Sequence, residues 1–278
     1  MTDHVAGKVV VITGAASGFG RLLSLKAAAR GARVVGGDVN AAGLAETAAQ
    51  VAAAGGEMAT SVTDVRRLAD VQALAHTAVE RFGAIDVMVN NAGTMPLGFY
   101  ADHAAATDAW DRCIDINVKG VLHGILAVHD QMLAQGRGHV INLSSIYGNF
   151  PVIGAAVYGA TKAAVDFLSE SLRMESRGKI KVTIVKPTGV PGTNLGSGII
   201  NVAALAGIYG PNAQAEFARN ESFAAGQMPS AELDPERIEY FALAPEYIVD
   251  AILHAIDQPW GVSIAEITVR ASGDGYVL

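Results

Sequence analysis

Residues Lys8 to Gly20 read KVVVITGAASGFG, and this stretch decides the fold that the rest of the chain is expected to adopt. Its first half, Lys8–Thr13, is a run of β-branched apolar residues, which is typical of a strand buried on both faces. A glycine-rich turn follows at residues 14–20, and a helical stretch runs from about Arg21 to Arg30. Glycines let the backbone approach a pyrophosphate, and a helix N-terminus offers free N–H groups and positive potential. The stretch therefore predicts a phosphate-binding strand, turn and helix.

The glycine spacing in this turn is T-G-x-x-x-G-x-G, from Thr13 to Gly20, rather than the more familiar G-x-G-x-x-G. Glycines also serve ordinary turns, so the pattern by itself is weak. Here it stands between a predicted strand and a predicted helix, which is the context that a dinucleotide-binding loop requires. We therefore expect this turn to hold a dinucleotide cofactor.

The nature of the cofactor is predicted from Asp38, at the end of a second expected strand, Arg33–Asp38. Asp38 lies 18 positions after Gly20. A carboxylate at about this distance can hydrogen-bond the adenosine ribose hydroxyls and would repel a 2′-phosphate. Val39 and Asn40, which follow, are not basic. The pattern favours NAD over NADP, the alternative being that Asp38 only begins the next turn.

Strand-like and helix-like stretches alternate along the remaining chain, which predicts a parallel sheet with helices on both faces. We expect one doubly wound α/β domain of the Rossmann type over residues 1–278, with residues 188–241 covering the substrate. The expected helices span residues 41–54, 68–82, 106–135, a stretch after Tyr158, and 245–256; the expected strands span residues 57–65, 86–89, 139–143, 179–185 and 264–269.

Composition excludes several classes of partner. The chain has 278 residues, is 51% hydrophobic and carries a formal charge of −7, which argues against nucleic acid or an anionic membrane as a partner. The single Cys113 and the spacing of the histidines predict neither a disulfide nor a metal site. The charge-free region between Lys186 and Glu216 is too often interrupted by Gly, Asn and Pro for a span of ~20 apolar residues. With no signal peptide visible, we expect a cytoplasmic protein.

Tyr158 and Lys162 are the strongest candidates for chemistry. They stand four residues apart in the run VYGATKAAVDFLSESL, whose apolar spacing predicts a helix, so both side chains share one helix face. A free tyrosine has a pKa near ~10 and is a poor base at neutral pH, but a neighbouring cation favours the phenolate. Such a pair can move a proton on and off an alcohol oxygen. Tyrosine and lysine also occur four apart on ordinary helix surfaces.

Further polar residues stand where strands end or inside an apolar helix. Asn90-Asn91-Ala92-Gly93 ends one strand and suits a close approach to a ligand, or a plain asparagine–glycine turn. Asn117 interrupts the apolar face of the helix expected over residues 106–135, where a satisfied core amide is the alternative to a functional role. Ser144 and Ser145 follow the strand at residues 139–143.

Together these motifs resemble the short-chain dehydrogenase/reductase family over about the whole chain. The glycine loop, the pair Asp64-Val65, Asn90–Gly93, a helix asparagine, a serine and Tyr-x-x-x-Lys occur in the order of the family. Ser145 stands thirteen residues before Tyr158, which is the interval of the family, and is chosen over Ser144 for that reason. The resemblance implies a Rossmann-type fold and hydride transfer between a nicotinamide and a carbonyl carbon.

The resemblance also implies roles for individual residues. Tyr158 is expected to act as the acid/base, Lys162 to hold the nicotinamide ribose and lower the tyrosine pKa, and Ser145 to hydrogen-bond the substrate oxygen. Asn117 is expected to order a water that links Lys162 to solvent. The residues expected along the cofactor are Gly14, Ser17, Gly18, Phe19, Gly20, Asp38, Asp64, Val65, Asn91, Ala92, Gly93, Tyr158, Lys162, Pro187 and Val190.

Two segments depart from the family pattern. After the sixth strand the chain reads Pro187-Thr188-Gly189-Val190-Pro191-Gly192-Thr193, where Thr188 adds a hydroxyl near the pocket. The last residues read Ser272-Gly273-Asp274-Gly275-Tyr276-Val277-Leu278 in place of the Asp-Gly-Gly that many members carry. Contacts of this second segment, including any between subunits, are therefore not carried over from the family.

The substrate is expected to be a small neutral molecule. Residues expected to line its pocket are Met95, Ser145, Tyr147, Phe150, Tyr158, Thr188, Leu195 and the apolar run Ile199–Tyr209. No Arg or Lys occurs between Lys186 and Arg219, and a carboxylate or phosphate would want such a cation. We therefore expect a fairly apolar secondary alcohol or ketone, cyclic or aromatic ones included, and a homo-oligomer that is a dimer or tetramer.

Three alternatives remain open at this stage. An NADP-dependent carbonyl reductase of the same family would share the site. A non-catalytic member that only binds a nucleotide would have no need of Asn117, Ser145, Tyr158 and Lys162 together. A sugar-nucleotide epimerase or dehydratase would use the same chemistry, but such relatives carry a larger C-terminal substrate domain than 278 residues allow.

Overall fold

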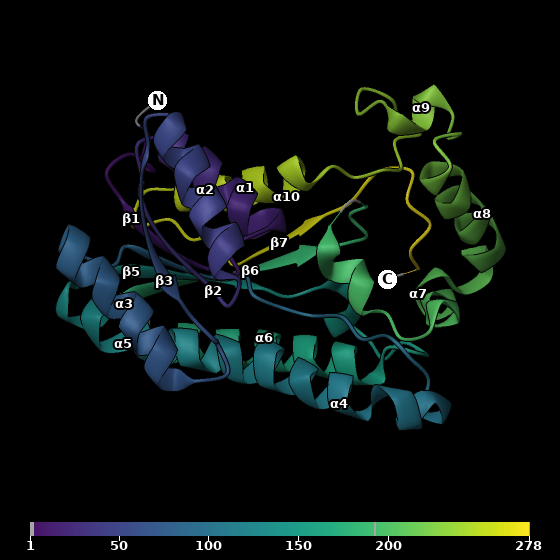
Figure 1. The fold of residues 1–278 in the computed structure, drawn as a ribbon, viewed down its shortest axis with the longest axis horizontal. Coiled ribbons are helices and arrows are strands. Elements are labelled where there is room, and N and C mark those ends of the chain that lie inside the picture. The colour runs from purple at the N-terminus through teal and green to yellow at the C-terminus, as the bar shows by residue number, and fades with distance from the viewer. Residues whose placement is uncertain (1–2, 192, 278) are drawn as a thin grey trace.

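The computed structural model describes residues 3–191 and 193–277, so Gly192 and Leu278, quoted above, lie outside the described residues. Seven strands form one sheet in the order β3-β2-β1-β4-β5-β6-β7, and each neighbouring pair is parallel (Figure 1). The strands are β1 (Val9–Thr13), β2 (Arg33–Asp38), β3 (Glu57–Val62), β4 (Val87–Asn90), β5 (Gly138–Leu143), β6 (Ile180–Pro187) and β7 (Glu266–Val269).

The centre of the sheet is apolar because helices cover both of its faces. Every residue of β1, β4 and β5 is buried. Strand β1 pairs with β2 on one side and β4 on the other, with Val10 opposite Val34 and Val87. The strand order therefore reverses between β1 and β4. In an open parallel sheet the ligand crevice forms at this reversal, beyond the carboxyl ends of the strands.

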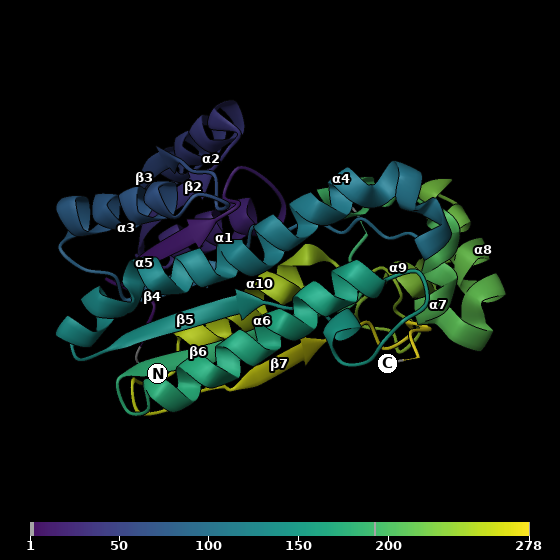
Figure 2. The same ribbon diagram turned by 90° about the horizontal axis from the view of Figure 1, so that it is seen from below.

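Two layers of helices enclose the sheet (Figures 1 and 2). One face is covered by α1 (Gly18–Ala29), α2 (Ala41–Ala53) and α10 (Pro245–Ile256), and the other by α3 (Leu68–Phe82), α5 (Gly120–Ala134) and α6 (Ala156–Glu175). Each interface has its own apolar core. Leu23, Ile12 and Ile252 belong to the first, and Leu74, Val128 and Val165 belong to the second.

The helix expected over residues 106–135 is interrupted. It begins earlier, as α4 (His103–Ile114), passes through a π turn, η2 (Asp115–Lys119), and continues as α5. A π turn inserts one residue into the helical ladder and is frequent at functional sites. Apolar periodicity cannot reveal such a turn, because the helical pattern on either side of it is intact.

The region of weak periodicity after β6 folds into short helices beyond the carboxyl edge of the sheet (Figures 1 and 2). These are η4 (Asn194–Gly198), η5 (Val202–Leu205), α7 (Ala206–Tyr209), η6 (Gly210–Asn212), α8 (Ala213–Ala224) and α9 (Ser230–Leu233); two more 3-10 turns, η1 (Tyr100–Asp102) and η3 (Ile146–Gly148), lie earlier in the chain. Together with Leu97 and Tyr147, residues of this region form a third apolar cluster.

The expected α/β architecture is confirmed, and most element bounds differ from expectation by a few residues. The largest difference in a strand is β3, which ends at Val62 rather than residue 65, so that Asp64 and Val65 lie in the loop that follows. None of the helices within residues 3–191 and 193–277 has both the length and the apolar character needed to cross a membrane.

Candidate active site

A cavity of about 730 Å³ lies at the carboxyl edge of the sheet, along the reversal between β1 and β4. Most of the residues predicted for the cofactor and the substrate line this one cavity. They are Gly14, Ser17, Gly18, Phe19, Asp38, Asp64, Val65, Asn91, Ala92, Gly93, Met95, Ser145, Tyr147, Tyr158, Lys162, Pro187, Thr188, Val190 and Leu195. Of the residues predicted individually, Gly20, Asn117 and Phe150 do not line it among the described residues.

The glycine turn has the shape of a phosphate cradle. Gly14 and Gly18 have φ values of +70° and +51°, which favour glycine. A Cβ at Gly18 would meet no atom within 4 Å, so there is open space beside this residue at the N-terminus of α1. Gly20 serves another purpose, because a Cβ there would overlap the carbonyl oxygen of Gly14. Its absence from the cavity wall is explained by this tight helix-to-loop packing.

The N-terminus of α1 is open toward the cavity. Ser17 is the N-cap residue, but its side chain makes no capping hydrogen bond. The first N–H groups of a helix have no partner within the helix, and they stabilise an anion that binds at that end. The residues present therefore fit the diphosphate of a dinucleotide.

Asp38 is held in a defined orientation at the end of β2. One carboxylate oxygen accepts a hydrogen bond from the Ala16 amide at 3.0 Å, and the other accepts one from the Asn40 amide at 2.9 Å. Asp38 lines the cavity beside Ser17 and Val39. The carboxylate thus lies at the predicted place and retains lone pairs that can accept further hydrogen bonds.

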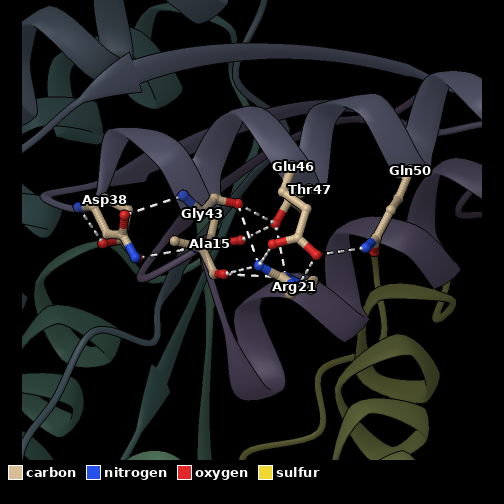
Figure 3. A network of polar contacts seen from close by, with 9 residues as sticks. Ala15, Arg21, Asp38, Gly43, Glu46, Thr47 and Gln50 are labelled. Atoms are coloured by element: carbon tan, nitrogen blue, oxygen red, sulfur yellow. Dashed lines mark hydrogen bonds and ion pairs between the residues drawn. The ribbon is translucent and has the colours of Figure 1, made fainter.

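Arg21 is a nearby cation that sequence reasoning did not consider, and its donors are engaged (Figure 3). Its guanidinium forms two parallel hydrogen bonds with Glu46, at 3.0 and 2.9 Å, and donates to the carbonyl of Ala16 at 2.6 Å. Its Nε atom also contacts the hydroxyl of Thr47 at 3.1 Å. Arg21 therefore ties the glycine turn to α2 rather than facing the cavity.

On the far side of the cofactor crevice, Asp64 and Asn91 make contacts that fix the loops. The Arg66 guanidinium beside Asp64 holds the pKa of that carboxyl below its usual value. The Asn91 side chain donates to the carbonyl of Thr13 at 2.8 Å, and the Thr13 hydroxyl accepts from the Ala92 amide. The end of β4 is thereby joined to the glycine turn after β1.

Tyr158, Ser145 and Lys162 meet in the interior of the cavity. Tyr158 and Lys162 come from the first turns of α6, as the four-residue spacing predicted, and both are buried. Tyr158 lies beside Ser145, which follows β5, and its ring packs edge-on against Tyr147 with centroids 5.5 Å apart. The Lys162 ammonium lies 5.7 Å from the Tyr158 ring centroid and donates to the Leu143 carbonyl at 2.7 Å.

The expected lowering of the tyrosine pKa by Lys162 does not arise from the groups of the chain itself. Burial raises the pKa of Tyr158 because it disfavours the phenolate, and the hydrogen bond from Ser145 offsets only part of this. Burial also lowers the pKa of Lys162, to about 8. The ammonium points to a backbone carbonyl instead of the phenol oxygen. A lower Tyr158 pKa therefore requires an additional positive charge in the cavity.

Asn117 lies behind the cavity, inside the π turn, and is 1% exposed. Its side chain makes two hydrogen bonds with the backbone of Thr94. It accepts one from the Thr94 amide at 3.0 Å and donates one to the Thr94 carbonyl at 2.9 Å. It also contacts the Thr161 hydroxyl, one residue before Lys162. The side chain is therefore a satisfied buried amide that joins the end of β4 to α6, and an ordered water linking Lys162 to solvent stays a proposal.

The predicted substrate side of the cavity is partly different from expectation. Met95, Tyr147, Thr188 and Leu195 line it. Phe150 does not, because its side chain is 63% exposed on the loop after η3. Of the run 199–209, the described cavity wall includes only Leu205, since Ala204, Ile208 and Tyr209 are buried in the third cluster. Apolar character alone could not distinguish a cavity wall from this packed core.

Sequence reasoning missed several residues that line the cavity, among them Arg112 and Tyr276. Arg112 lies on α4, one turn before the π turn, and its position was hidden within an ordinary amphipathic pattern. Tyr276 belongs to the segment that departs from the family ending, and that departure was the only signal in the sequence. Residues 193–198 also line the cavity, as the predicted covering region should.

A parallel sheet with a glycine cradle and a buried Ser–Tyr–Lys cluster defines a nucleotide-dependent oxidoreductase of the Rossmann class. The model of the short chain dehydrogenase family matches residues 8–201, which is more than half of the chain. An uncharacterized oxidoreductase of Listeria monocytogenes is 35% identical over 265 residues, covering 95% of this chain and 96% of that protein. The chain therefore belongs to the short chain dehydrogenase family.

Solved structures agree with this assignment. A serine dehydrogenase in its closed form, complexed with NADP+, is 27% identical with a TM-score of 0.77, covering 97% of both chains. A short chain dehydrogenase/reductase from Burkholderia phymatum in complex with NAD is 30% identical with a TM-score of 0.75, covering 96% of this chain and 90% of that one. Both cofactors thus occur among similar structures.

Proposed function

We propose that this protein transfers a hydride between NAD(H) and a small secondary alcohol or ketone, with Tyr158 as the acid/base. The observation that carries the proposal is the convergence of Ser145, Tyr158 and Lys162 in the cavity that also holds the glycine cradle. The choice of NAD over NADP rests on Asp38, because the similar structures include complexes with each.

In this proposal the bound nicotinamide supplies the hydride donor or acceptor. The residues of the chain manage the proton and the charge on the substrate oxygen. Tyr158 gives its proton to that oxygen during reduction and takes it back during oxidation. The Ser145 hydroxyl, which lines the same cavity as Tyr158, donates to the same oxygen and stabilises its developing charge. Lys162 binds the ribose beside the nicotinamide through its ammonium.

The walls of the substrate side favour a neutral molecule. Met95, Tyr147 and Leu205 supply apolar surface, and the Thr188 hydroxyl is buried and has no hydrogen-bond partner among the described residues. Arg112 nevertheless brings a guanidinium to the same cavity. A compact hydroxy acid is therefore the second candidate substrate, favoured by Arg112 and by the similarity to a serine dehydrogenase.

A substrate screen with NAD and NADP in parallel tests the proposal. Absorbance of the reduced cofactor is followed with cyclohexanol, phenylethanol and L-serine, and with cyclohexanone in the reverse direction. Turnover of the neutral alcohols with NAD supports the proposal. Turnover of L-serine alone selects the second candidate. Binding of NADH without turnover of any of these compounds would favour a nucleotide-binding protein without catalysis.

The rate of alcohol oxidation should rise with pH, and the rate of ketone reduction should fall over the same range. Oxidation needs the Tyr158 phenolate as base, whereas reduction needs the protonated phenol. Burial raises the pKa of Tyr158, so both changes should continue into the alkaline range. Profiles of kcat with a deuterated alcohol, which shows whether chemistry limits the rate, measure this. A flat oxidation profile with a full isotope effect would contradict the assignment.

Closure over the substrate should be confined to residues 193–198. This stretch lines the cavity and contains exposed residues, whereas residues 204–209 are packed into the third cluster. Few buried contacts mean a low cost of local opening. Hydrogen exchange of the backbone amides should therefore slow in residues 193–198 when NAD and cyclohexanol are added, while residues 204–209 are protected in both states. Equal protection of residues 193–198 with and without ligands would show that the stretch is fixed.

We also propose a homo-oligomer. Helices α5 and α6 lie side by side (Figure 2), and each carries large apolar side chains that are exposed. Leu126 on α5 is 50% exposed, and Phe167 and Met174 on α6 are 77% and 71% exposed. An apolar helix surface of this kind is typical of a contact between subunits.

A further inference from the structure

One wall of the substrate cavity is formed by residues 272–277, which we call the closing segment. The segment follows β7 and returns over the carboxyl edge of the sheet toward α7 (Figure 1). Its residue Tyr276 lines the same cavity as Tyr158, Lys162 and Thr188. The closing segment therefore reaches the reacting region from the opposite end of the sequence to the glycine cradle.

The Tyr276 ring has a fixed position. It stacks on Tyr209 with ring centroids 5.4 Å apart and planes inclined by 27°. Tyr209 is itself held by the Asn220 amide at 3.0 Å and by the edge of Phe217. Burial beside these phenols raises the pKa of Tyr276 and keeps it neutral. The ring thus presents a rigid, uncharged surface to the cavity.

Glycines on both sides allow the segment to approach so closely. A Cβ at Gly189, in the loop after β6, would overlap the Tyr276 hydroxyl. A Cβ at Gly275 would lie 2.5 Å from a carboxylate oxygen of Glu216. Gly210 faces Val277, where a Cβ would be 3.0 Å from the valine side chain. The absence of a side chain at each of these three positions therefore makes room for the closing segment.

Polar contacts anchor the segment to α8 and α7. The Arg219 guanidinium donates to the Gly273 carbonyl at 2.8 Å and to Glu216 at 2.9 Å, and Glu216 is only 2% exposed. The Val277 amide donates to the Ile208 carbonyl at 3.1 Å. Because these contacts hold both ends of the segment, Tyr276 cannot move away without breaking the hydrogen bond from Arg219 to Gly273 or the backbone hydrogen bond from Val277 to Ile208.

We propose that Tyr276 is a specificity-determining residue: its ring closes the substrate cavity and limits the size of the substrate. The inference rests on the proposed dehydrogenase function. The effect of the Tyr276 ring on the space in the cavity can nevertheless be tested by ligand binding, without turnover. The Tyr276 ring and hydroxyl contact Tyr209, whereas Tyr158 pairs with Ser145 and Tyr147. Tyr276 therefore sets the size of the substrate rather than taking part in proton transfer.

The first test measures binding of prodan, a neutral naphthyl ketone whose emission reports an apolar environment. Tyr276→Ala should bind prodan about tenfold more tightly than the wild type, because the naphthalene gains contact area that the phenol occupies. Tyr276→Phe, the matched control, keeps the ring and should bind prodan as the wild type does. Unchanged binding by Tyr276→Ala, or equally tighter binding by Tyr276→Phe, would overturn the proposal.

A second variant covers the case in which Tyr276→Ala does not fold. If Tyr276→Ala loses its cooperative thermal transition, Tyr276→Leu decides, because leucine keeps apolar contact with Tyr209 and is shorter than tyrosine. Tighter prodan binding by Tyr276→Leu supports the proposal that the Tyr276 ring limits the size of the bound molecule. Binding equal to that of the wild type overturns this proposal. NADH titration by fluorescence should give the same Kd for all variants, since the closing segment lies on the substrate side.

The second test separates this inference from the proposed function. The ratio of kcat/KM for naphthylethanol to that for cyclohexanol, measured with NAD, should rise at least about tenfold in Tyr276→Ala. If the wild type oxidises neither alcohol while prodan binding responds as described, the proposed function fails for these substrates. The proposal that Tyr276 limits the size of the bound molecule is then retained. If the wild type turns over both alcohols and the ratio is unchanged in Tyr276→Ala, the role of Tyr276 is refuted while the proposed dehydrogenase function is retained.

Discussion

Tyr158→Phe is expected to lower kcat by at least about a thousandfold while NADH binding is retained. The variant removes the hydroxyl that exchanges a proton with the substrate oxygen, and a positioned acid/base contributes about 10²–10⁴ to the rate. The ring keeps its edge-on contact with Tyr147, 5.5 Å away between centroids, so the local packing survives. Loss of the hydrogen bond to Ser145 should cost only about 1 kcal/mol of stability.

The measurement is kcat at saturating alcohol and NAD, with NADH binding followed by fluorescence and folding by thermal denaturation. Tyr147→Phe is the matched comparison, because it removes a phenol hydroxyl from the same cavity. The Tyr147 hydroxyl is buried and has no hydrogen-bond partner in residues 3–191 and 193–277, and we expect a loss of no more than about tenfold there. Similar losses in the two variants, or substantial turnover by Tyr158→Phe, would refute the acid/base assignment.

Sequence patterns predicted the parts of the site that depend on local structure. The strand, glycine turn and helix at residues 8–30 follow from residue periodicity and from the backbone freedom of Gly14 and Gly18. Tyr158 and Lys162 share a surface because four residues make about one helical turn. Asp38 lies at the end of its strand because strand length and the next turn are also local properties. These features needed no knowledge of distant contacts.

The remaining features depend on contacts between segments far apart in the sequence. Tyr276 reaches the cavity only because Gly189 and Gly210 leave room for it, and no periodicity connects these positions. Phe150 was assigned to the pocket from its apolar character, but the loop that carries it turns the side chain outward. The pKa of Tyr158 was expected to fall from the proximity of Lys162, whereas the cost of burying the phenolate exceeds that attraction. Burial is a property of the whole fold.

A preference for NAD over NADP of at least about 100-fold in kcat/KM is expected from the position of Asp38. Its carboxylate is held by the amides of Ala16 and Asn40 at the end of β2, facing the cavity beside Ser17. Each hydrogen bond from a ribose hydroxyl to this charged group contributes about 1.5–3 kcal/mol. A 2′-phosphate would displace such bonds and add repulsion, and each ~1.4 kcal/mol corresponds to a factor of ten.

Arg21 is a cation in the polar network beside Asp38, and it supports the preference rather than opposing it. Its donors are taken by Glu46, the Ala16 carbonyl and Thr47 (Figure 3). To bind a 2′-phosphate, Arg21 would have to give up its bidentate pair with Glu46. Because such an exposed pair is worth little by itself, Glu46→Gln tests whether Arg21 can be recruited.

The decisive comparison measures kcat/KM with NAD and NADP for the wild type, Glu46→Gln, and the double variant Asp38→Ala, Val39→Arg. The double variant removes the repelling carboxylate and adds a guanidinium at an exposed position that lines the cavity, so it should narrow or reverse the preference. Glu46→Gln should leave NAD preferred, because the Ala16 carbonyl and Thr47 still hold Arg21. Wild-type protein that uses NADP as well as NAD would show that Asp38 does not face the ribose, and a strong gain in NADP use by Glu46→Gln would identify Arg21 as the residue that binds the phosphate.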